Sequence, residues 1–303
     1  MDNAAKSVLF IVNPVAGRRL GVKSSDSLGA RLLKEGFDVN IIETKCAGDA
    51  TRIAREHCLS YDVIACTGGD GTLHEVVNGL MAHEQRPPLM YFPSGTMNVV
   101  AHNLGITGLP KAAAAKVLAG HPTPYDIGHF SSADGSLSRY FTFIATFGAF
   151  SSVSYSTSQG LKNTLGYFAY FLQGIKNLSE LKSYNVNIRC NENNVSESVI
   201  FGAVTNSRSA GGVLRINSDN LRMDDGIFEV LFIKTPKNPF ELERIIAMLL
   251  SGQYNDNYIR FYQTSNIAVS CENEIEWCLD GERGGAIKGA VVEVKSAALR
   301  IFC

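Results

Sequence analysis

The stretch TGGDGTLHEVVNGL, residues 67–80, places three glycines and an aspartate between a strand pattern and a helix pattern. The run before it, YDVIACT, is short and apolar, which is typical of a buried strand. The apolar residues after the glycines have the spacing of an amphipathic helix, namely Leu73, Val76, Val77 and Leu80. Gly68, Gly69 and Gly71 therefore form a turn where something comes very close to the backbone, or where φ is positive.

The same junction predicts a site for an anion. Thr72 and Glu75 have the spacing of a capping box, so we expect the helix to begin near Thr72. The N–H groups and the positive dipole at a helix start suit a phosphate group, although a tight connection without a ligand explains the glycines equally well. Asp70 favours the functional interpretation. Beside a phosphate, a carboxylate can bind Mg²⁺ through water, bind a ribose hydroxyl, or accept a proton in the reaction.

Length and composition are those of a globular protein with two domains. The chain has 303 residues, of which 45% are hydrophobic and 19% charged. A formal net charge of −1 argues against a nucleic-acid partner. The seven cysteines form no CxxC pair and the histidines show no metal-binding spacing, so we expect reduced thiols in a cytoplasmic protein. No signal peptide or transmembrane segment is expected, because the longest uncharged stretch, residues 140–161, is rich in Ser and Thr.

The hydrophobic pattern changes along the chain and predicts the domains. Residues 1–125 alternate strand and helix signals, which predicts an α/β nucleotide-binding domain with a mostly parallel, Rossmann-like sheet. Residues 126–290 carry shorter alternating runs, which predict a mainly antiparallel β domain for the substrate. Residues 291–303 form a C-terminal segment that can return to the first domain. Because ligands of parallel sheets bind at the carboxyl ends of the strands, the loops NPVAGRR, TGGDGT and PSGTMN are expected to converge.

These motifs, together with YDIG, DDGIFEV and LDGE, resemble the diacylglycerol kinase catalytic-domain family. That family includes bacterial lipid kinases and the sphingosine and ceramide kinases, and it is distantly related to NAD kinases. The resemblance spans nearly the whole chain. GGDGT alone does not separate these kinases, whereas the NP start, the GTxN loop and the late DGE together favour the lipid kinases.

The resemblance implies an ATP site in the first domain. Arg18 and Arg19 are either partners of the phosphates or a solvated helix start. Many bacterial members carry Asn where this chain has His74, and the sphingosine and ceramide kinases are more similar there, which leaves the acceptor lipid open. The residues expected to bind the nucleotide are Asn13, Thr44, Gly68, Gly69, Asp70, Gly71, Thr72, Leu73, His74 and Thr96.

Two later Asp-Gly pairs are hairpin-turn signals that need separate interpretations. Asp134 and Gly135 are expected to form a type I′ turn and nothing more. The stretch RMDDGIF is either such a turn or, by resemblance to the family, a loop for a structural Mg²⁺. The metal ligands would then be the Asp225 side chain and the main-chain oxygens of Arg222 and Ile227, with Asp126 linked to the metal through water.

The stretch EIEWCLDGE has a period of two, which fixes the register of a strand that arrives at Asp280 and Gly281. The family's DGE glutamate is proposed as the base that takes the proton of the lipid hydroxyl, which makes Glu282 the first candidate for that role. Asp70 is the second candidate, because sphingosine kinases have been interpreted as using the aspartate of their GDG motif as the base. The aromatic segment LGYFAYFLQGI, residues 165–175, is either plain core or the lip of a lipid site.

The expected activity is therefore that of an ATP- and Mg²⁺-dependent lipid kinase, with a diacylglycerol-like acceptor met at a membrane surface. Three alternatives stay open: a kinase for a sphingoid base or another lipid, an NAD-kinase-like enzyme for a soluble substrate, and a non-catalytic nucleotide-binding module. The sequence also leaves open whether the chain forms a homodimer.

Overall fold

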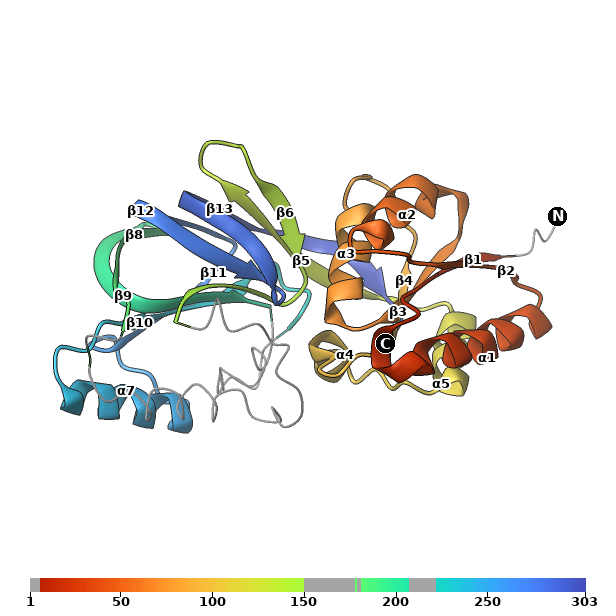
Figure 1. Cartoon of the computed structure of the whole chain (residues 1–303), viewed down its shortest axis with the longest axis horizontal. Coiled ribbons are helices and arrows are strands. Elements are labelled where there is room, and N and C mark those ends of the chain that lie inside the picture. The colour runs from red at the N-terminus through yellow and green to blue at the C-terminus, as the bar shows by residue number, and fades with distance from the viewer. Residues whose placement is uncertain (1–5, 150–177, 179–180, 207–221) are drawn as a thin grey trace. The chain divides into compact units, whose positions relative to one another are not determined.

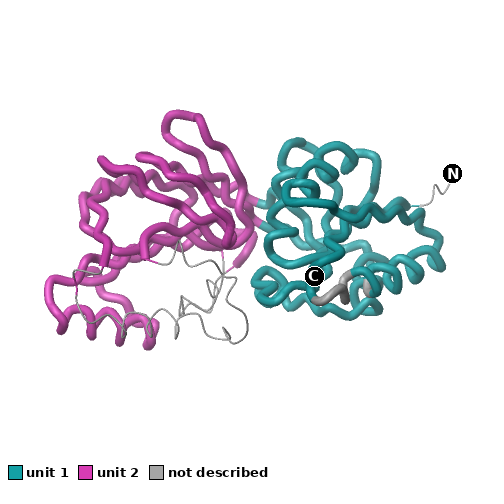
Figure 2. The backbone as a smooth tube through the Cα atoms, in the orientation of Figure 1, with its two compact units in different colours: residues 1–125, 297–303 teal, residues 126–296 magenta. Residues whose placement is uncertain are grey.

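The computed structural model describes residues 6–149, 178, 181–206 and 222–303. Within it the chain forms two compact units, Met1–Tyr125 with Ala297–Cys303, and Asp126–Ser296 (Figures 1 and 2). Two strands, β5 (Thr123–Ser132) and β13 (Glu282–Ile301), carry the chain from one unit into the other. The aromatic segment 165–175 lies outside the described residues, so its expected role as a lipid lip stays a prediction.

The first unit is built on four parallel strands. They are β1 (Ser7–Val12), β2 (Asp38–Glu43), β3 (Val63–Gly68) and β4 (Leu89–Pro93), in the order β2-β1-β3-β4. The chain moves outward from β1 to β2 and then returns across β1 to β3 and β4. The order therefore reverses between β1 and β3, which is the point where ligands of open parallel sheets bind.

Helices cover both faces of these strands. Helices α1 (Leu20–Lys34) and α5 (Pro110–Ala119) lie on one face, and α2 (Asp49–His57) and α3 (Asp70–Leu80) lie on the other (Figure 1). Because helices cover both faces, the strands β1 and β3 are buried on both sides, which explains why they are apolar at almost every position. The predicted apolar stripe of α3 is confirmed, since its four members are fully buried: Leu73, Val76, Val77 and Leu80.

The end of the chain contributes to the first unit. Ile301 of β13 pairs in parallel with Leu89 of β4, and the Phe302 N–H donates to the Leu89 carbonyl at 3.0 Å. The Phe302 side chain is buried in the same apolar cluster as Phe10 and Met90. The last residues thus complete the core of a unit whose other residues all precede residue 126.

The described strands of the second unit pair in an antiparallel manner. Strands β9 (Asn193–Thr205) and β12 (Asn266–Leu279) each pair with both β7 (Ile144–Gly148) and β8 (Tyr184–Cys190), so these four strands close around an aromatic core. There the Trp277 ring lies 5.1 Å from the Phe130 ring and 4.8 Å from the Phe147 ring, between centroids. The other described elements of this unit are β6 (Ser138–Phe141), β10 (Phe228–Lys234), α7 (Pro239–Ser251) and β11 (Ile259–Thr264).

The β5–β6 hairpin carries Asp134 and Gly135, but the type I′ turn predicted there is wrong. The Gly135 N–H donates to the Ser132 carbonyl at 3.0 Å, so Ala133 and Asp134 are the central residues of the turn, and neither has a positive φ. The Asp134 carboxylate instead accepts hydrogen bonds from Ser132 and Ser136, which lower its pKa to about 2. Local side-chain bonds of this kind are what select the observed turn.

We predict that Gly79→Ala weakens the packing of α3 on α2. A Cβ at Gly79 would lie 2.5 Å from the Thr51 carbonyl oxygen and 2.6 Å from the Ala54 Cβ, and neither atom can rotate away. Such overpacking should lower the free energy of unfolding by about 1–3 kcal/mol, measured by urea denaturation. Gly29→Ala in α1 is the matched control, because its Cβ would meet only side-chain atoms at ordinary or nearly ordinary distances, the Val39 Cγ1 at 3.3 Å and the Ile41 Cδ1 at 3.8 Å. Equal stability of the two variants would contradict the packing described.

Candidate active site

The switch point between β1 and β3 is bridged by Asn13. This residue directly follows β1, and its N–H donates to the Thr67 carbonyl of β3 at 2.9 Å. Its side-chain Nδ2 donates to the Thr72 Oγ1 at 3.1 Å, while its Oδ1 accepts from the Val15 N–H at 3.1 Å. Asn13 therefore ties the end of one strand to the start of the helix that follows the other.

Gly68 and Gly69 are explained by close approach, and none of the three loop glycines is explained by positive φ. Positive φ values do not occur at Gly68, Gly69 or Gly71. A Cβ on Gly68 would lie 2.4 Å from the Thr72 Cβ, and a Cβ on Gly95 would lie 2.5 Å from the Gly69 Cα. The backbone of the loop after β3 thus contacts the backbone of the loop after β4 directly.

Helix α3 begins earlier than expected, and the predicted capping box is wrong. The helix starts at Asp70, with Gly69 as its N-cap, so Thr72 already lies inside the first turn. The Glu75 carboxylate does not turn back to Thr72; it accepts hydrogen bonds from Gly48 and Ala50 instead. The N–H groups at the start of an α-helix lie outside its own hydrogen-bond ladder, which here leaves them directed at the loop.

The loop after β4 is held together by the Asn98 side chain, a role that was not predicted from the sequence. Asn98 has φ 49° and caps the short helix α4 (Val99–Leu104). Its Oδ1 accepts from the Gly95 N–H at 3.0 Å and from the Tyr91 hydroxyl at 3.2 Å, and its Nδ2 donates to the Gly95 carbonyl at 2.8 Å. The Ser94 N–H in turn donates to the Gly68 carbonyl at 2.9 Å. Asn98 belongs to the GTMN motif, whereas Tyr91 carried no sequence signal.

The other residues expected at the nucleotide are placed as follows. Thr44 directly follows β2, where its N–H donates to the Val12 carbonyl at 2.9 Å, and Thr96 is exposed on the loop after β4. The side chains of Leu73 and His74 are buried within α3, so neither is presented at the surface of the loop. Nothing is described for the side chains of Arg18 and Arg19, which end the short 3-10 helix η1 (Ala16–Arg19).

In the second unit, buried Asp126 organises the DDG loop. Its Oδ2 accepts from the Gly226 N–H at 2.6 Å, and its own N–H donates to the Met223 carbonyl at 2.8 Å. Exposed Asp225 accepts from the Ile227 N–H at 3.0 Å through Oδ1. The three residues expected to bind a metal, Arg222, Asp225 and Ile227, therefore lie in one ordered loop.

The donors of this loop are of the kind that Mg²⁺ accepts. A carboxylate and main-chain carbonyls are oxygen ligands, which hard divalent cations prefer. Among the residues described, no group of three or more His, Cys, Asp or Glu side chains is close enough to hold a metal. A metal here would thus depend on main-chain oxygens. Glu229, two residues after Ile227, is a further buried acid that the sequence did not signal, and burial raises its pKa to about 7.

The DGE turn is held by a buried carboxylate. Leu279 pairs with Glu282 across a two-residue loop, and Asp280 and Gly281 have φ values of 51° and 90°, so this Asp-Gly pair forms the type I′ turn. The Asp280 Oδ2 accepts from the Thr142 N–H and hydroxyl at 2.6 and 2.9 Å. Its Oδ1 accepts from the N–H groups of the next two residues, Phe143 and Ile144, at 3.0 and 3.1 Å.

Because Asp280 is anchored in this way, the residue after the turn is fixed as well. The Asp280 N–H also donates to the Ile144 carbonyl at 2.9 Å, so the turn is bonded to the 142–144 segment through both side chain and main chain. Glu282 is exposed at the first position of β13. An exposed carboxylate on a rigid turn is suited to accept a proton from a bound substrate.

We predict that Asp280→Asn destabilises the protein although the side chain keeps its size. The amide would set an NH₂ group against at least one buried N–H donor, and each unsatisfied donor costs about 1–3 kcal/mol. Chemical denaturation should show a loss of this size. Asp256→Asn, at an exposed aspartate of the same unit, should change the stability by less than about 0.5 kcal/mol. A neutral Asp280→Asn variant would mean that the carboxylate does not hold the turn.

Comparison with known proteins shows which family the chain resembles. The model of the diacylglycerol kinase catalytic domain matches residues 7–130, and that of the YegS C-terminal NAD kinase beta sandwich-like domain matches residues 146–303. A diacylglycerol kinase of Bacillus subtilis is 33% identical over 295 residues, covering 95% of this chain and 94% of its own. One of Staphylococcus saprophyticus is 30% identical, covering 96% and 93%.

A solved structure gives the same result. A Bacillus anthracis protein described as a candidate diacylglycerol kinase superposes with a TM-score of 0.79 at 25% identity, covering 100% of this chain and 98% of its own. In the described part of the chain, no helix has the length and apolar character needed to cross a membrane. The two matched domain models and the full-length relatives lead to one conclusion: this chain belongs to the diacylglycerol kinase catalytic-domain family.

Proposed function

We propose that this chain is an ATP-dependent lipid kinase that transfers the γ-phosphoryl group of ATP to a hydroxyl of a diacylglycerol-like lipid. One observation carries the proposal. The glycine loop lies at the switch point of the parallel strands and at the head of α3, in a chain that matches relatives named diacylglycerol kinase over nearly its full length.

In this proposal the first unit is a Rossmann-like domain that contains the nucleotide site. ATP supplies the phosphoryl group, and Mg²⁺ neutralises the charge that develops on it. The N–H groups at the start of α3 hold the phosphates, because a helix N-terminus attracts anions. Asn13, Thr44 and Thr96 lie in the loops after β1, β2 and β4, all at the carboxyl edge of the parallel strands, where they can contact the rest of the nucleotide.

The second unit supplies the acceptor side. Glu282 is the proposed base for the lipid hydroxyl, and Asp70 at the first position of α3 is the alternative. Phosphoryl transfer has a loose transition state, so the larger contribution comes from orienting the hydroxyl and the phosphates. The proposed Mg²⁺ loop of Arg222, Asp225 and Ile227 keeps its geometry through Asp126 and has a structural role.

The proposal is tested with labelled ATP, Mg²⁺ and vesicles that contain diacylglycerol. We expect labelled phosphatidic acid, and turnover that falls by about 10²–10⁴-fold in Glu282→Gln, the usual size of a general-base effect, while ATP affinity measured by calorimetry stays unchanged. Glu276→Gln is the matched control, because Glu276 is an exposed glutamate of β12 that is ion-paired to Arg283. It should keep normal turnover.

The remaining outcomes separate the alternatives. Near-normal turnover of Glu282→Gln, together with loss of turnover in Asp70→Asn that still binds ATP, would assign the base to Asp70. Label in a sphingoid base, or in NAD without vesicles, would replace the diacylglycerol-like acceptor. ATP binding without transfer to any of these acceptors would leave a non-catalytic module and overturn the proposal.

The metal loop is tested by stability. If Mg²⁺ binds at Asp225, then Mg²⁺ should raise the melting temperature of the wild type but not that of Asp225→Ala, because a ligand of the folded state stabilises it by mass action. Asp224→Ala is the control, since Asp224 is ion-paired to Arg222 at 3.1 Å and is not among the proposed ligands. Equal protection of wild type and Asp225→Ala by Mg²⁺ would make Asp225 a turn residue only.

A further inference from the structure

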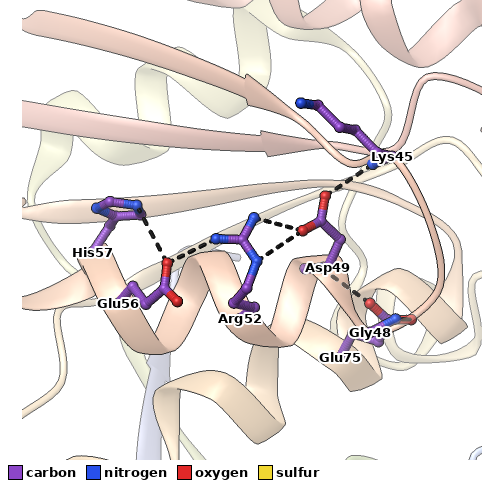
Figure 3. A network of polar contacts seen from close by, with 8 residues as sticks. Lys45, Gly48, Asp49, Arg52, Glu56, His57 and Glu75 are labelled. Atoms are coloured by element: carbon purple, nitrogen blue, oxygen red, sulfur yellow. Dashed lines mark hydrogen bonds and ion pairs between the residues drawn. The ribbon is translucent and has the colours of Figure 1, made fainter.

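The geometry assigns to Glu75 a positioning role in the nucleotide site. Glu75 lies one and a half turns into α3, and its carboxylate bonds to the start of α2, the helix that follows Thr44 (Figure 3). We propose that this carboxylate clamp holds the loop after β2 in place, so that Thr44 can bind the nucleoside part of ATP. The inference rests on the proposed function, because it assumes that ATP binds at this edge.

The clamp acts as a helix cap supplied by another helix. The Glu75 Oε1 accepts from the Gly48 N–H at 2.9 Å, and its Oε2 accepts from the Ala50 N–H at 3.1 Å. Gly48 is the N-cap of α2 and has φ 83°, but it has no side chain with which to cap the helix itself. A carboxylate is the most favourable group at this position, since it satisfies two backbone donors and faces the positive end of the helix dipole.

The loop that the clamp holds is ordered from within by a second carboxylate. Buried Asp49 accepts from the Lys45 N–H at 2.9 Å and from the Arg52 guanidinium at 2.6 and 3.1 Å (Figure 3). The Lys45 N–H and the Arg52 guanidinium keep the pKa of the Asp49 carboxyl below its ordinary value, so it stays ionised. The segment from Lys45 to Asp49 is thus closed by a hydrogen bond between its ends, and Glu75 attaches that segment to α3.

Because Glu75 lies on α3, the clamp connects the Thr44 loop to the helix that starts at the proposed phosphate site. Helix α3 begins at Asp70, within the glycine loop, and is a continuous α-helix from there through Glu75. The clamp therefore sets how far Thr44 stands from the proposed phosphate site. A further bond from the Thr51 Oγ1 to the Glu75 carbonyl, at 2.9 Å, joins the same two helices without contacting the loop.

The test compares two ligands and three variants. Calorimetry measures Mg·ATP, which needs both the phosphate site and the Thr44 loop, and inorganic tripolyphosphate, which needs the phosphate site alone. Glu75→Gln loses one acceptor of the clamp, and its NH₂ group faces a backbone N–H. We expect its Kd for ATP, and likewise its KM for ATP, to rise about tenfold, as is typical for a lost hydrogen bond to a charged group. Its Kd for tripolyphosphate should change by less than about twofold, and kcat should change little.

Two controls separate positioning from plain stability. Thr51→Val removes another bond between α2 and α3 and should lower the melting temperature without a selective loss of ATP affinity. Glu56→Gln removes an exposed charge of the same network, which is ion-paired to Arg52 at 2.7 Å, and should bind both ligands normally. If Glu75→Gln does not fold, Glu75→Asp replaces it, because it keeps the charge and shortens the reach.

The outcomes distinguish this inference from the proposed function. A wild type that binds neither ligand would contradict the nucleotide site itself. A wild type that binds ATP, with Glu75 variants that either bind ATP equally well or lose ATP and tripolyphosphate alike, would overturn the clamp and leave the kinase proposal standing. Selective loss of ATP affinity in the Glu75 variants alone would support it.

Discussion

The parallel pairing of β1 with β3 is the constraint on which the candidate site depends. The chain leaves these neighbouring strands in opposite directions, toward β2 on one side and β4 on the other. The two following loops therefore separate, and the edge between them is open to a ligand. Asn13 bridges that edge to Thr72, and the close contact of Gly69 with Gly95 brings in the loop after β4. The bond from Asn13 to Thr72 could not form if another strand stood between β1 and β3, and the contact of Gly69 with Gly95 likewise requires that β3 and β4 are neighbours.

The second unit uses one device twice. In each case a buried aspartate accepts backbone N–H hydrogen bonding from another segment and thereby fixes a turn that presents an exposed acid. Asp126 orders the loop that carries Asp225, and Asp280 orders the turn that precedes Glu282. Burying a carboxylate is costly unless its oxygens are satisfied, and here backbone N–H groups from neighbouring segments satisfy them. The buried acids thus supply rigidity, and the exposed acids are available for chemistry.

The sequence predicted those features that depend on local spacing. The apolar stripe of α3 was predictable because helix periodicity is a property of neighbouring residues, and the antiparallel strands of the second unit followed from their alternation. The capping box was predicted wrongly, because the Glu75 carboxylate accepts a hydrogen bond from Gly48 instead. Gly48 lies 27 residues earlier in the chain and is an N-cap residue without a side chain. Spacing alone cannot reveal such a competitor.

The same distinction applies to the turns and the site. Asp134 and Asp280 both precede glycine, yet only the second forms a type I′ turn, because Ser132 and Ser136 engage the Asp134 carboxylate. The glycine loop and Glu282 could be chosen from their motifs. The bonds that hold them, from Asn13, Asn98 and Asp280, join residues that only the fold brings together.

Hydrogen–deuterium exchange, with and without a non-hydrolysable ATP analogue and Mg²⁺, tests the central claim most directly, because it locates the nucleotide on the intact chain. The account predicts slower exchange in the peptides that cover residues 67–75 and 94–98, the segments that follow β3 and β4 at the carboxyl edge of the parallel strands. Protection confined to peptides of the second unit, or to the opposite edge of the parallel strands, would contradict it.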